Sequence, residues 1–308
     1  MTRSLVLTAD DAGTDPDADR EIAALLAGSP LTAVGVITTE PDGGVEDWVE
    51  AGGERDDGPH RDGADRPASP GQSQRQCQSE SFGERPGESP GAVRAVGLVA
   101  RSAPDIAPGV HVVLPTPGPA GGFDDVVDRI ATQVDALMRA TAAVGAPPPR
   151  RLDSHQGTLY GLQGRSYLGE AIGFCARHGL AFRLPRSLDL YGDGDPVLAT
   201  ADVRARHASA VVAADAAGVR LPEVIATHRG GDAEARDYVS LRDHYLRLLG
   251  RLPEGTSEIF LHPAPDTARL REASATWWRK RTWELRLLGD PVFIREIERE
   301  GIDLVSGW

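Results

Sequence analysis

The 308-residue sequence predicts an α/β fold whose strands form a parallel sheet. Short apolar runs alternate with amphipathic helical patterns along the chain, which is typical of consecutive βαβ units. The most unusual polar motifs directly follow apolar runs, and parallel α/β folds place their sites at such strand ends. One long polar tract interrupts the alternation, which indicates an insertion into this fold and not a second fold.

The expected strands are short runs of aliphatic and β-branched residues. AVGVIT at 33–38 and GVHVVL at 109–114 are two examples. Runs of four to eight such residues are typical of strands buried on both faces. The same pattern predicts strands at residues 5–9, 151–154, 180–184, 258–261 and 304–305.

The expected helices carry apolar residues three and four positions apart. Gly179 and Gly250 mark two helix ends, because glycine readily follows a last helical turn. Helices are predicted at residues 17–26, 93–101, 123–144, 167–178, 199–217 and 241–249. The segment 273–299 is expected to hold one or two helices, broken near Pro291.

Residues from about 41 to about 92 have a different composition from the rest of the chain. They are rich in Gly, Asp, Glu, Arg, Ser, Pro and Gln and offer almost nothing to bury. Such a segment gains too little from burial to offset its ordering entropy. We expect a long disordered insertion within a single domain that spans residues 1–308, with Trp48 as its one local anchor and His60 inert.

The composition argues against several classes of protein. A net charge of −13 repels phosphate backbones and anionic lipids, so neither nucleic acid nor a membrane is an expected partner. Cys77 and Cys175 have no CxxC spacing, which argues against a thiolate zinc site or a disulfide framework. The apolar run at 5–7 is too short for a signal peptide, so the expected compartment is the cytoplasm. A homodimer stays possible.

Four polar motifs lie in or just after predicted strands. They are Thr8-Ala9-Asp10-Asp11, Gly109-Val110-His111, Asp153-Ser154-His155-Gln156 and His262-Pro263. Each alone has an ordinary structural explanation, such as a turn, a helix cap or a hydrogen-bonded core histidine. Two acids and three histidines at strand ends are together much harder to explain in that way. We therefore expect them to meet at one rim of the sheet.

A carboxylate and two imidazoles form a facial triad that suits Zn²⁺, Mn²⁺ or Fe²⁺, whereas Mg²⁺ prefers oxygen ligands. An ion held there would lower the pKa of a water molecule and polarise a carbonyl group. A second carboxylate can accept the proton of the water, and a further histidine can protonate a leaving nitrogen. This set of groups fits the hydrolysis of an amide.

These motifs resemble the pattern of the YdjC/ChbG carbohydrate deacetylase family. The resemblance rests on TADD, GVH, DSHQ and EIFLHPA in this order. It extends to RTWEL at 281–285 and LGDP at 288–291, which are similar to the family's C-terminal R-x-x-E-L…D-P signature. It covers most of the chain outside about 41–92.

The resemblance implies a deformed (β/α) barrel of TIM-like type that removes N-acetyl groups from an amino-sugar or a short oligosaccharide. It implies that Asp11, His111 and His155 hold one divalent metal ion, either Mg²⁺ or Zn²⁺. Asp10 would be the general base, and His262 the acid or the oxyanion partner. The expected partner molecule is thus a small N-acetylated sugar.

The sequence departs from the family pattern beside these motifs. Gly157 and Leu159 replace two histidines that usually follow DSHQ, and Ala12 replaces an aromatic residue. The family's second strand also usually carries Ser or Thr and Met, in place of AVGVI at 33–37. The contacts to the substrate are therefore expected to differ from those of chitin-oligosaccharide deacetylases.

Further candidates for substrate binding are Arg183, Gln156 and His228. Arg183 could alternatively orient Asp10 or lie at the surface. His228 could alternatively be a structural or surface residue that takes no part in binding. Three tryptophans could stack on a sugar ring or pack in the core: Trp277, Trp278 and Trp283.

Two alternatives to a sugar deacetylase remain at this stage. One is a metal-dependent amidohydrolase that acts on a non-sugar amide. The other is a carbohydrate-binding protein that has kept the fold without turnover.

Overall fold

A computed structural model describes residues 2–39, 89–115, 124–162 and 164–308. Within these residues, parallel strands form one curled sheet in the order β5-β4-β3-β2-β1-β7-β6, with β8 beside β1. The α/β class and the parallel sheet expected from the sequence are confirmed. The strands are β1 (Arg3–Ala12), β2 (Ala33–Val36), β3 (Gly109–Val112), β4 (Arg151–Ser154), β5 (Ala181–Phe182), β6 (Ile225–Ala226), β7 (Gly255–Leu261) and β8 (Ile302–Leu304).

Strand β1 is the centre of the sheet. It pairs with β7 on one side from Arg3 to Ala9. Its other side is shared, because β8 pairs with the first half of β1 and β2 with the second half. The two ends of the sheet approach each other where the amides of Phe182 and Ser187 donate to the carbonyls of Arg220 and Glu223, both at 3.0 Å. The sheet is therefore curled into a deformed, partly open barrel.

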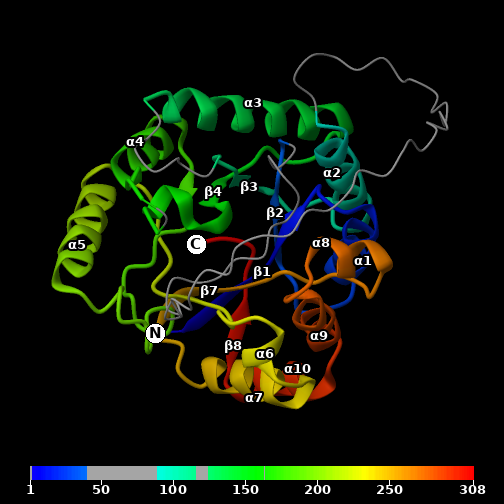
Figure 1. The fold of residues 1–308 in the computed structure, drawn as a ribbon. Helices are drawn as coiled ribbons and strands as arrows, with labels where there is room; N and C mark the ends of the chain where they lie inside the picture. The colour runs from blue at the N-terminus through cyan, green and yellow to red at the C-terminus, as the bar shows by residue number, and fades with distance from the viewer. Residues whose placement is uncertain (1, 40–88, 116–123, 163) are drawn as a thin grey trace, which may run out of the picture.

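The helices surround this sheet, as Figure 1 shows. Regular caps fix several of their ends. The Asp15 side chain accepts from the amide of Asp17 at the start of α1, and Gly145 ends α3 in the left-handed conformation. The helices are α1 (Pro16–Leu26), α2 (Pro90–Ser102), α3 (Val126–Val144), α4 (Leu168–His178), α5 (Ala201–Ala216), α6 (Asp232–Ala235), α7 (Tyr238–Leu249), α8 (Ala268–Ala273), α9 (Trp278–Leu288) and α10 (Pro291–Arg299).

The C-terminal segment follows the expected arrangement, with one unpredicted helix before it. The segment predicted to hold one or two helices contains α9 and α10, and α8 precedes them. Pro291 begins α10, with the Asp290 side chain accepting from the amide of Val292. Proline fits this position because the first helical N–H needs no partner within the helix.

One helix start and two short elements differ from the prediction. Helix α2 begins at Pro90, capped by Ser89, so the last residues of the tract expected to be disordered are helical. The rest of that prediction, with Trp48, His60 and Cys77, lies outside the described residues. Strand β6 and helix α6 were not predicted, because two to four residues carry too little periodicity to be recognised.

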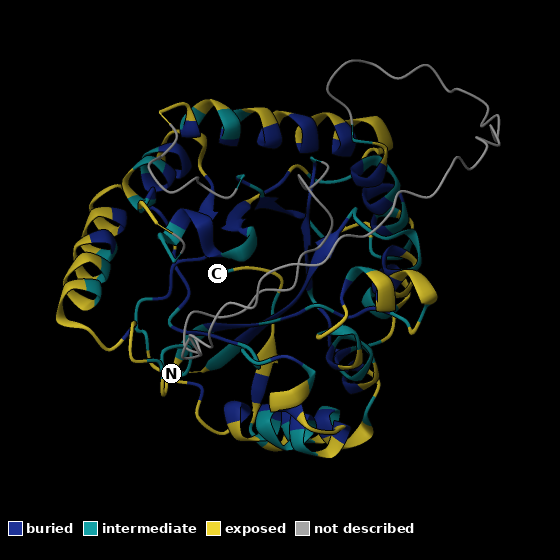
Figure 2. Cartoon of the chain, in the orientation of Figure 1, coloured by how far each residue is buried: buried dark blue, intermediate teal, exposed yellow. Residues whose placement is uncertain are grey.

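The core lies between the strands and the inner faces of the helices, where buried residues gather in Figure 2. Inside the curl of the sheet, however, several fully buried side chains are charged or polar: Thr8, Asp10, Asp153, Arg183 and Glu258. No helix in the described part of the chain is long and apolar enough to cross a membrane.

Helix α3 offers a matched test of this packing. Leu137 is fully buried, whereas the neighbouring Met138 is 45% exposed. Leu137→Ala should lower the free energy of unfolding by about 2–5 kcal/mol, through lost burial and the cavity left behind. Met138→Ala should change it by less than about 0.5 kcal/mol. Urea unfolding of both variants decides the point, and equal effects would contradict the packing of α3.

Candidate metal centre and active site

A bulge at the end of β1 turns Asp10 and Asp11 into the same cavity. Successive side chains of a regular strand point to opposite faces, so neighbours cannot normally share a site. Here the pairing register of β1 with β2 shifts between Ala9 and Ala12, and Asp11 has φ 64°. Aspartate tolerates this left-handed conformation better than most residues. The local backbone therefore brings two adjacent carboxylates to one site.

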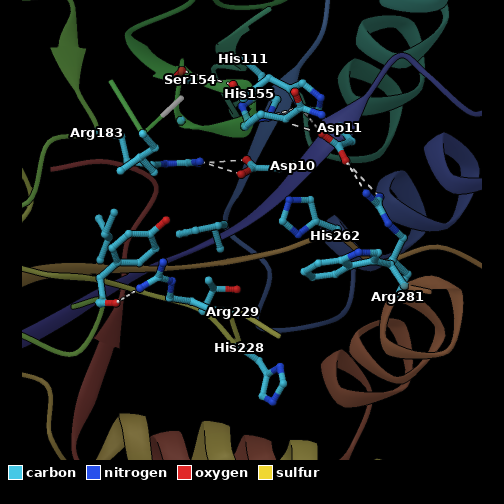
Figure 3. Close-up of a pocket in the computed structure, with 18 of the residues that line it drawn as sticks. Asp10, Asp11, His111, Ser154, His155, Arg183, His228, Arg229, His262 and Arg281 are labelled. Atoms are coloured by element: carbon cyan, nitrogen blue, oxygen red, sulfur yellow. Dashed lines mark hydrogen bonds and ion pairs between the residues drawn. The ribbon is translucent and has the colours of Figure 1, made fainter. Parts of the chain in front are cut away.

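Three ligand atoms from three strand ends converge in that cavity (Figure 3). Asp11 Oδ1 lies 3.1 Å from His155 Nδ1 and 3.4 Å from His111 Nε2. The two histidine nitrogens are 3.2 Å apart. The structure thus assembles the three residues that the motifs predicted as metal ligands.

This arrangement fits a metal ion. Ligands about 2.1 Å from zinc are about 3.0 Å apart at right angles and about 3.4 Å apart in a tetrahedron, which spans the observed separations. Asp11 Oδ1 is buried and accepts no hydrogen bond from the residues that the structure describes. A buried carboxylate oxygen without a donor is costly, and a cation would satisfy it. The three side chains could therefore hold one ion.

Asp153 supports His111 from behind. The two side chains are paired through His111 Nδ1 and Asp153 Oδ1, which leaves Nε2 to face the cavity. Metal-binding histidines commonly use their second nitrogen in this way. Burial alone would lower the pKa of His111, but Asp153 and Asp10 outweigh it and raise the pKa to about 10. In the sequence, Asp153 appeared only as part of DSHQ, without a role.

Arg183 holds Asp10 in place. Its Nη1 and Nη2 donate to the two oxygens of Asp10 at 2.6 and 3.0 Å. Its Nε donates to Glu258 at 2.9 Å, and Nη2 also lies 3.2 Å from Asp153. Burial alone would raise the pKa of Asp10, yet Arg183 and then His111 outweigh it and hold the pKa well below its usual range. Asp10 is therefore ionised at neutral pH.

The position of Arg183 bears on its predicted role. It is buried, and all three guanidinium nitrogens have carboxylate partners. The structure thus places it where it orients Asp10, the alternative considered above, with no free nitrogen for a substrate. Asp10, His111 and Asp153 also form a cluster of potential ligands, but Arg183 already contacts both of its carboxylates.

Helix α9 contributes a residue whose role the sequence did not reveal. Arg281 Nη1 and Nη2 both lie 3.0 Å from Asp11 Oδ2. The guanidinium thereby occupies one oxygen of the carboxylate and leaves Oδ1 facing the two histidines. Burial alone would raise the pKa of Asp11, but His155 and Arg281 hold it well below the usual range. The motif R-x-x-E-L was visible in the sequence, although spacing alone could not show that its arginine reaches β1.

Glu284 of the same motif supports His262. It accepts from the backbone amide of His262 and the hydroxyl of Tyr245, both at 2.8 Å, and Lys280 Nζ lies 3.1 Å away. The His262 ring lies between Asp10 and Arg281 in the cavity. Burial lowers the pKa of His262 to about 4, so its ring is neutral at pH 7 and carries one N–H donor.

The remaining candidates separate into two groups. Gln156 and His228 line the cavity, and His228 Nδ1 contacts the carbonyl of Gly230 at 3.0 Å. Trp277 also lines it, whereas Trp283 packs against the main core and Trp278 lies between Arg271 and Arg279. Part of the cavity wall is aromatic and apolar, with Tyr160, Leu162, Tyr191 and Phe260.

The family model for YdjC-like proteins matches residues 88–299. The chain belongs to the YdjC-like family. This confirms the resemblance that the motifs indicated. The matched region contains His111, His155, His262 and Arg281, while Asp10 and Asp11 precede it. A search of curated protein sequences gave no significant match.

Two solved structures share the fold of this family member over nearly their whole length. A candidate cellobiose-phosphate cleavage protein from Enterococcus faecalis V583 has a TM-score of 0.61 at 18% identity, with 99% of this chain and 97% of that chain covered. The lactam utilization protein from Thermus thermophilus has a TM-score of 0.51 at 14% identity, with 98% and 99% covered. At these identities, the likeness concerns the fold alone.

The contact between Arg281 and Asp11 yields a prediction about metal affinity. Removing a partner that orients a metal ligand typically weakens binding about 10–100-fold. Arg281→Gln should therefore weaken Zn²⁺ binding by roughly that factor, measured by competition with a chromophoric chelator. Arg279→Gln, two residues away on α9 with an exposed side chain, is the control and should bind as the parent does. Unchanged affinity in Arg281→Gln would show that the contact does not orient Asp11.

Proposed function

We propose that this protein is a metal-dependent hydrolase that removes acetyl groups from an N-acetylated amino-sugar. The observation that carries the proposal is the position of an ionised carboxylate, Asp10, directly beside the triad of Asp11, His111 and His155. Amide hydrolysis needs an electrophilic metal ion and a base for water within one cavity. Membership in the YdjC-like family supports a carbohydrate as the substrate.

Zn²⁺ is the ion we propose, since two imidazole nitrogens and one carboxylate oxygen are typical zinc ligands. Mg²⁺, the other ion considered, prefers oxygen ligands and would have only Asp11 here. When bound, the ion would polarise the acetamide carbonyl and make a water molecule more acidic. Arg281 keeps the second oxygen of Asp11 occupied, so that the carboxylate offers one atom to the ion.

Asp10 accepts the proton of the attacking water in this proposal. The bidentate contact with Arg183 fixes the orientation of the carboxylate, and each oxygen retains a further lone pair for the water. Gly35 on β2 leaves space there, because a Cβ at this position would lie 2.6 Å from Asp10 Oδ1. A rigidly held base needs little rearrangement as the reaction proceeds.

His262 serves the other side of the reacting amide. Its neutral ring donates a hydrogen bond from one nitrogen, which suits the oxygen that gains charge or the amine that departs. Glu284 fixes the backbone amide of this residue. The sugar ring would lie against the aromatic wall, where Tyr191, Phe260 and Trp277 offer surfaces for its C–H groups.

The two acidic residues should separate base catalysis from metal binding. Asp10→Asn should lower the rate of acetate release about 10²–10⁴-fold, the usual contribution of a general base. It should retain its metal, because Asp10 is not among the three convergent ligands. Asp11→Asn should lose metal affinity as well as activity. Metal stoichiometry and acetate release from N-acetylglucosamine are measured for both variants.

The outcomes distinguish the competing functions. Loss of metal from Asp10→Asn with retention in Asp11→Asn would reverse the two roles. Release of acetate from simple amides, with none from N-acetylated sugars, would favour the non-sugar amidohydrolase. If the zinc-loaded protein binds N-acetylated sugars but releases no acetate, the result would favour a carbohydrate-binding protein without turnover.

A further inference from the structure

A second cavity adjoins the candidate active site. The two share one wall, formed by Tyr160, Leu162, Tyr191 and Ile225. None of the convergent metal ligands lines the second cavity, nor does Asp10 or His262. We call this second cavity the annex. It extends the site on the side away from the reacting groups.

The lining of the annex is predominantly apolar. Few polar side chains line it, and two of them have partners elsewhere: His207 Nε2 contacts the carbonyl of Pro185 at 2.7 Å, and Arg206 Nε donates to the carbonyl of Asp202. A polar ligand group would lose its hydration there and find few hydrogen-bonding partners, whereas an apolar group needs none. Aliphatic side chains come from α4, the segment after β5 and α5: Leu168, Leu184, Leu188, Leu198 and Val203.

The annex is large enough for a small hydrocarbon group. Its volume is about 140 Å³. An engineered cavity of about 150 Å³ with a similar lining binds benzene. At its edge, Val197 is 47% exposed, so apolar surface faces water unless a ligand covers it.

Contacts with neighbouring residues hold the shared wall in place. The Tyr160 hydroxyl donates to the carbonyl of Arg183 at 2.7 Å, and the Arg229 guanidinium lies 4.8 Å from the Tyr191 ring centre. Leu162 packs against Gly157, where an added Cβ would lie 2.6 Å from Leu162 Cδ1. Because Gly157 also has φ +66°, a side chain there is disfavoured, and the leucine keeps its apolar surface toward both cavities.

We propose that the annex binds an apolar aglycone attached to the N-acetylated sugar. This inference rests on the proposed function. The sugar would occupy the first cavity, whose lining includes the polar groups of Gln156, Thr227 and Arg229. A long N-acyl chain reaching the annex from the metal centre would instead lay hydrocarbon against those polar groups. The aglycone is therefore the part of the substrate that fits the annex.

Binding of alkyl glycosides tests the proposal without requiring turnover. The methyl, butyl and hexyl β-glycosides of N-acetylglucosamine are titrated into the Asp10→Asn protein loaded with zinc. Each methylene that becomes fully buried should tighten binding about 4-fold. The butyl glycoside has three more methylenes than the methyl glycoside, so full burial of these three should tighten binding about 60-fold. Affinity that is flat across the series would overturn the proposal.

Two variants locate the effect in the annex. Val203 on α5 lines it, whereas Val212 on the same helix is 68% exposed and lies outside its lining. Val203→Asp should remove most of the gain from methyl to hexyl and leave methyl glycoside binding unchanged. Val212→Asp is the matched control and should keep the gain. Val197→Asp, at a half-exposed position, provides a second test should Val203→Asp unfold, which thermal melting reveals.

The failure of this inference differs from that of the proposed function. The zinc-loaded parent protein could bind longer alkyl glycosides more tightly and yet release no acetate. That result would refute the deacetylase and support the proposed role of the annex. Acetate release together with an affinity that does not depend on the length of the alkyl chain would support the deacetylase and refute the proposed role of the annex. Tighter binding of N-octanoylglucosamine than of the hexyl glycoside, lost in Val203→Asp, would assign the annex to an acyl chain and overturn the aglycone.

Discussion

The site depends on one buried guanidinium. Arg183 lies at the end of β5 and joins carboxylates from three other strands: Asp10 of β1, Asp153 of β4 and Glu258 of β7. Buried charges are expensive unless they are paired, and removing one partner leaves the others uncompensated. Arg183 therefore links these strand ends in the curled sheet and offsets part of their negative charge. The buried Arg151, whose Nη1 lies 3.9 Å from Glu258 Oε1, and the His111 ring beside Asp153 offset more of it.

Two chains of contacts extend from this cluster to the candidate metal ligands. Asp153 receives Arg183 on one side and pairs with His111 on the other, which directs His111 Nε2 into the cavity. Arg281 reaches Asp11 from α9 and leaves one of its oxygens without a hydrogen bond from the described residues. These outer contacts limit the freedom of Asp11 and His111 in the candidate metal centre.

The same arrangement separates two environments on either side of the reacting groups. Charged and polar side chains surround Asp10 and Asp11, while Tyr160, Tyr191 and Phe260 make another part of the wall aromatic. A sugar has polar hydroxyl groups and apolar C–H faces, so a cavity with both kinds of lining suits it. The annex continues the apolar side beyond that wall, so that substrate selectivity is proposed to come from the loops after β4 and β5 and from α5.

Much of the fold could be predicted from periodicity, because long helices and buried strands repeat their apolar residues regularly. The short elements β6 and α6 could not, since so few residues contain no period. The predicted start of α2 also lay too late in the chain, because the polar composition before Pro90 concealed the Ser89 cap. Gly157 was recognised as a departure from the family pattern, but its close contact with Leu162 became visible only in three dimensions.

The sequence by itself determined the α/β class, the family, and which acids and histidines belong together, because motifs at strand ends in parallel sheets share one rim. Only the tertiary structure decided what each of those residues faces. Asp10 and Asp11 reach one cavity through a bulge at the end of β1, which the pattern of apolar and polar residues does not predict. The partners Arg183, Arg281, Glu258 and Glu284 come from positions distant in the chain. Spacing fixes only local geometry, whereas charge pairing across the barrel depends on how the sheet curls.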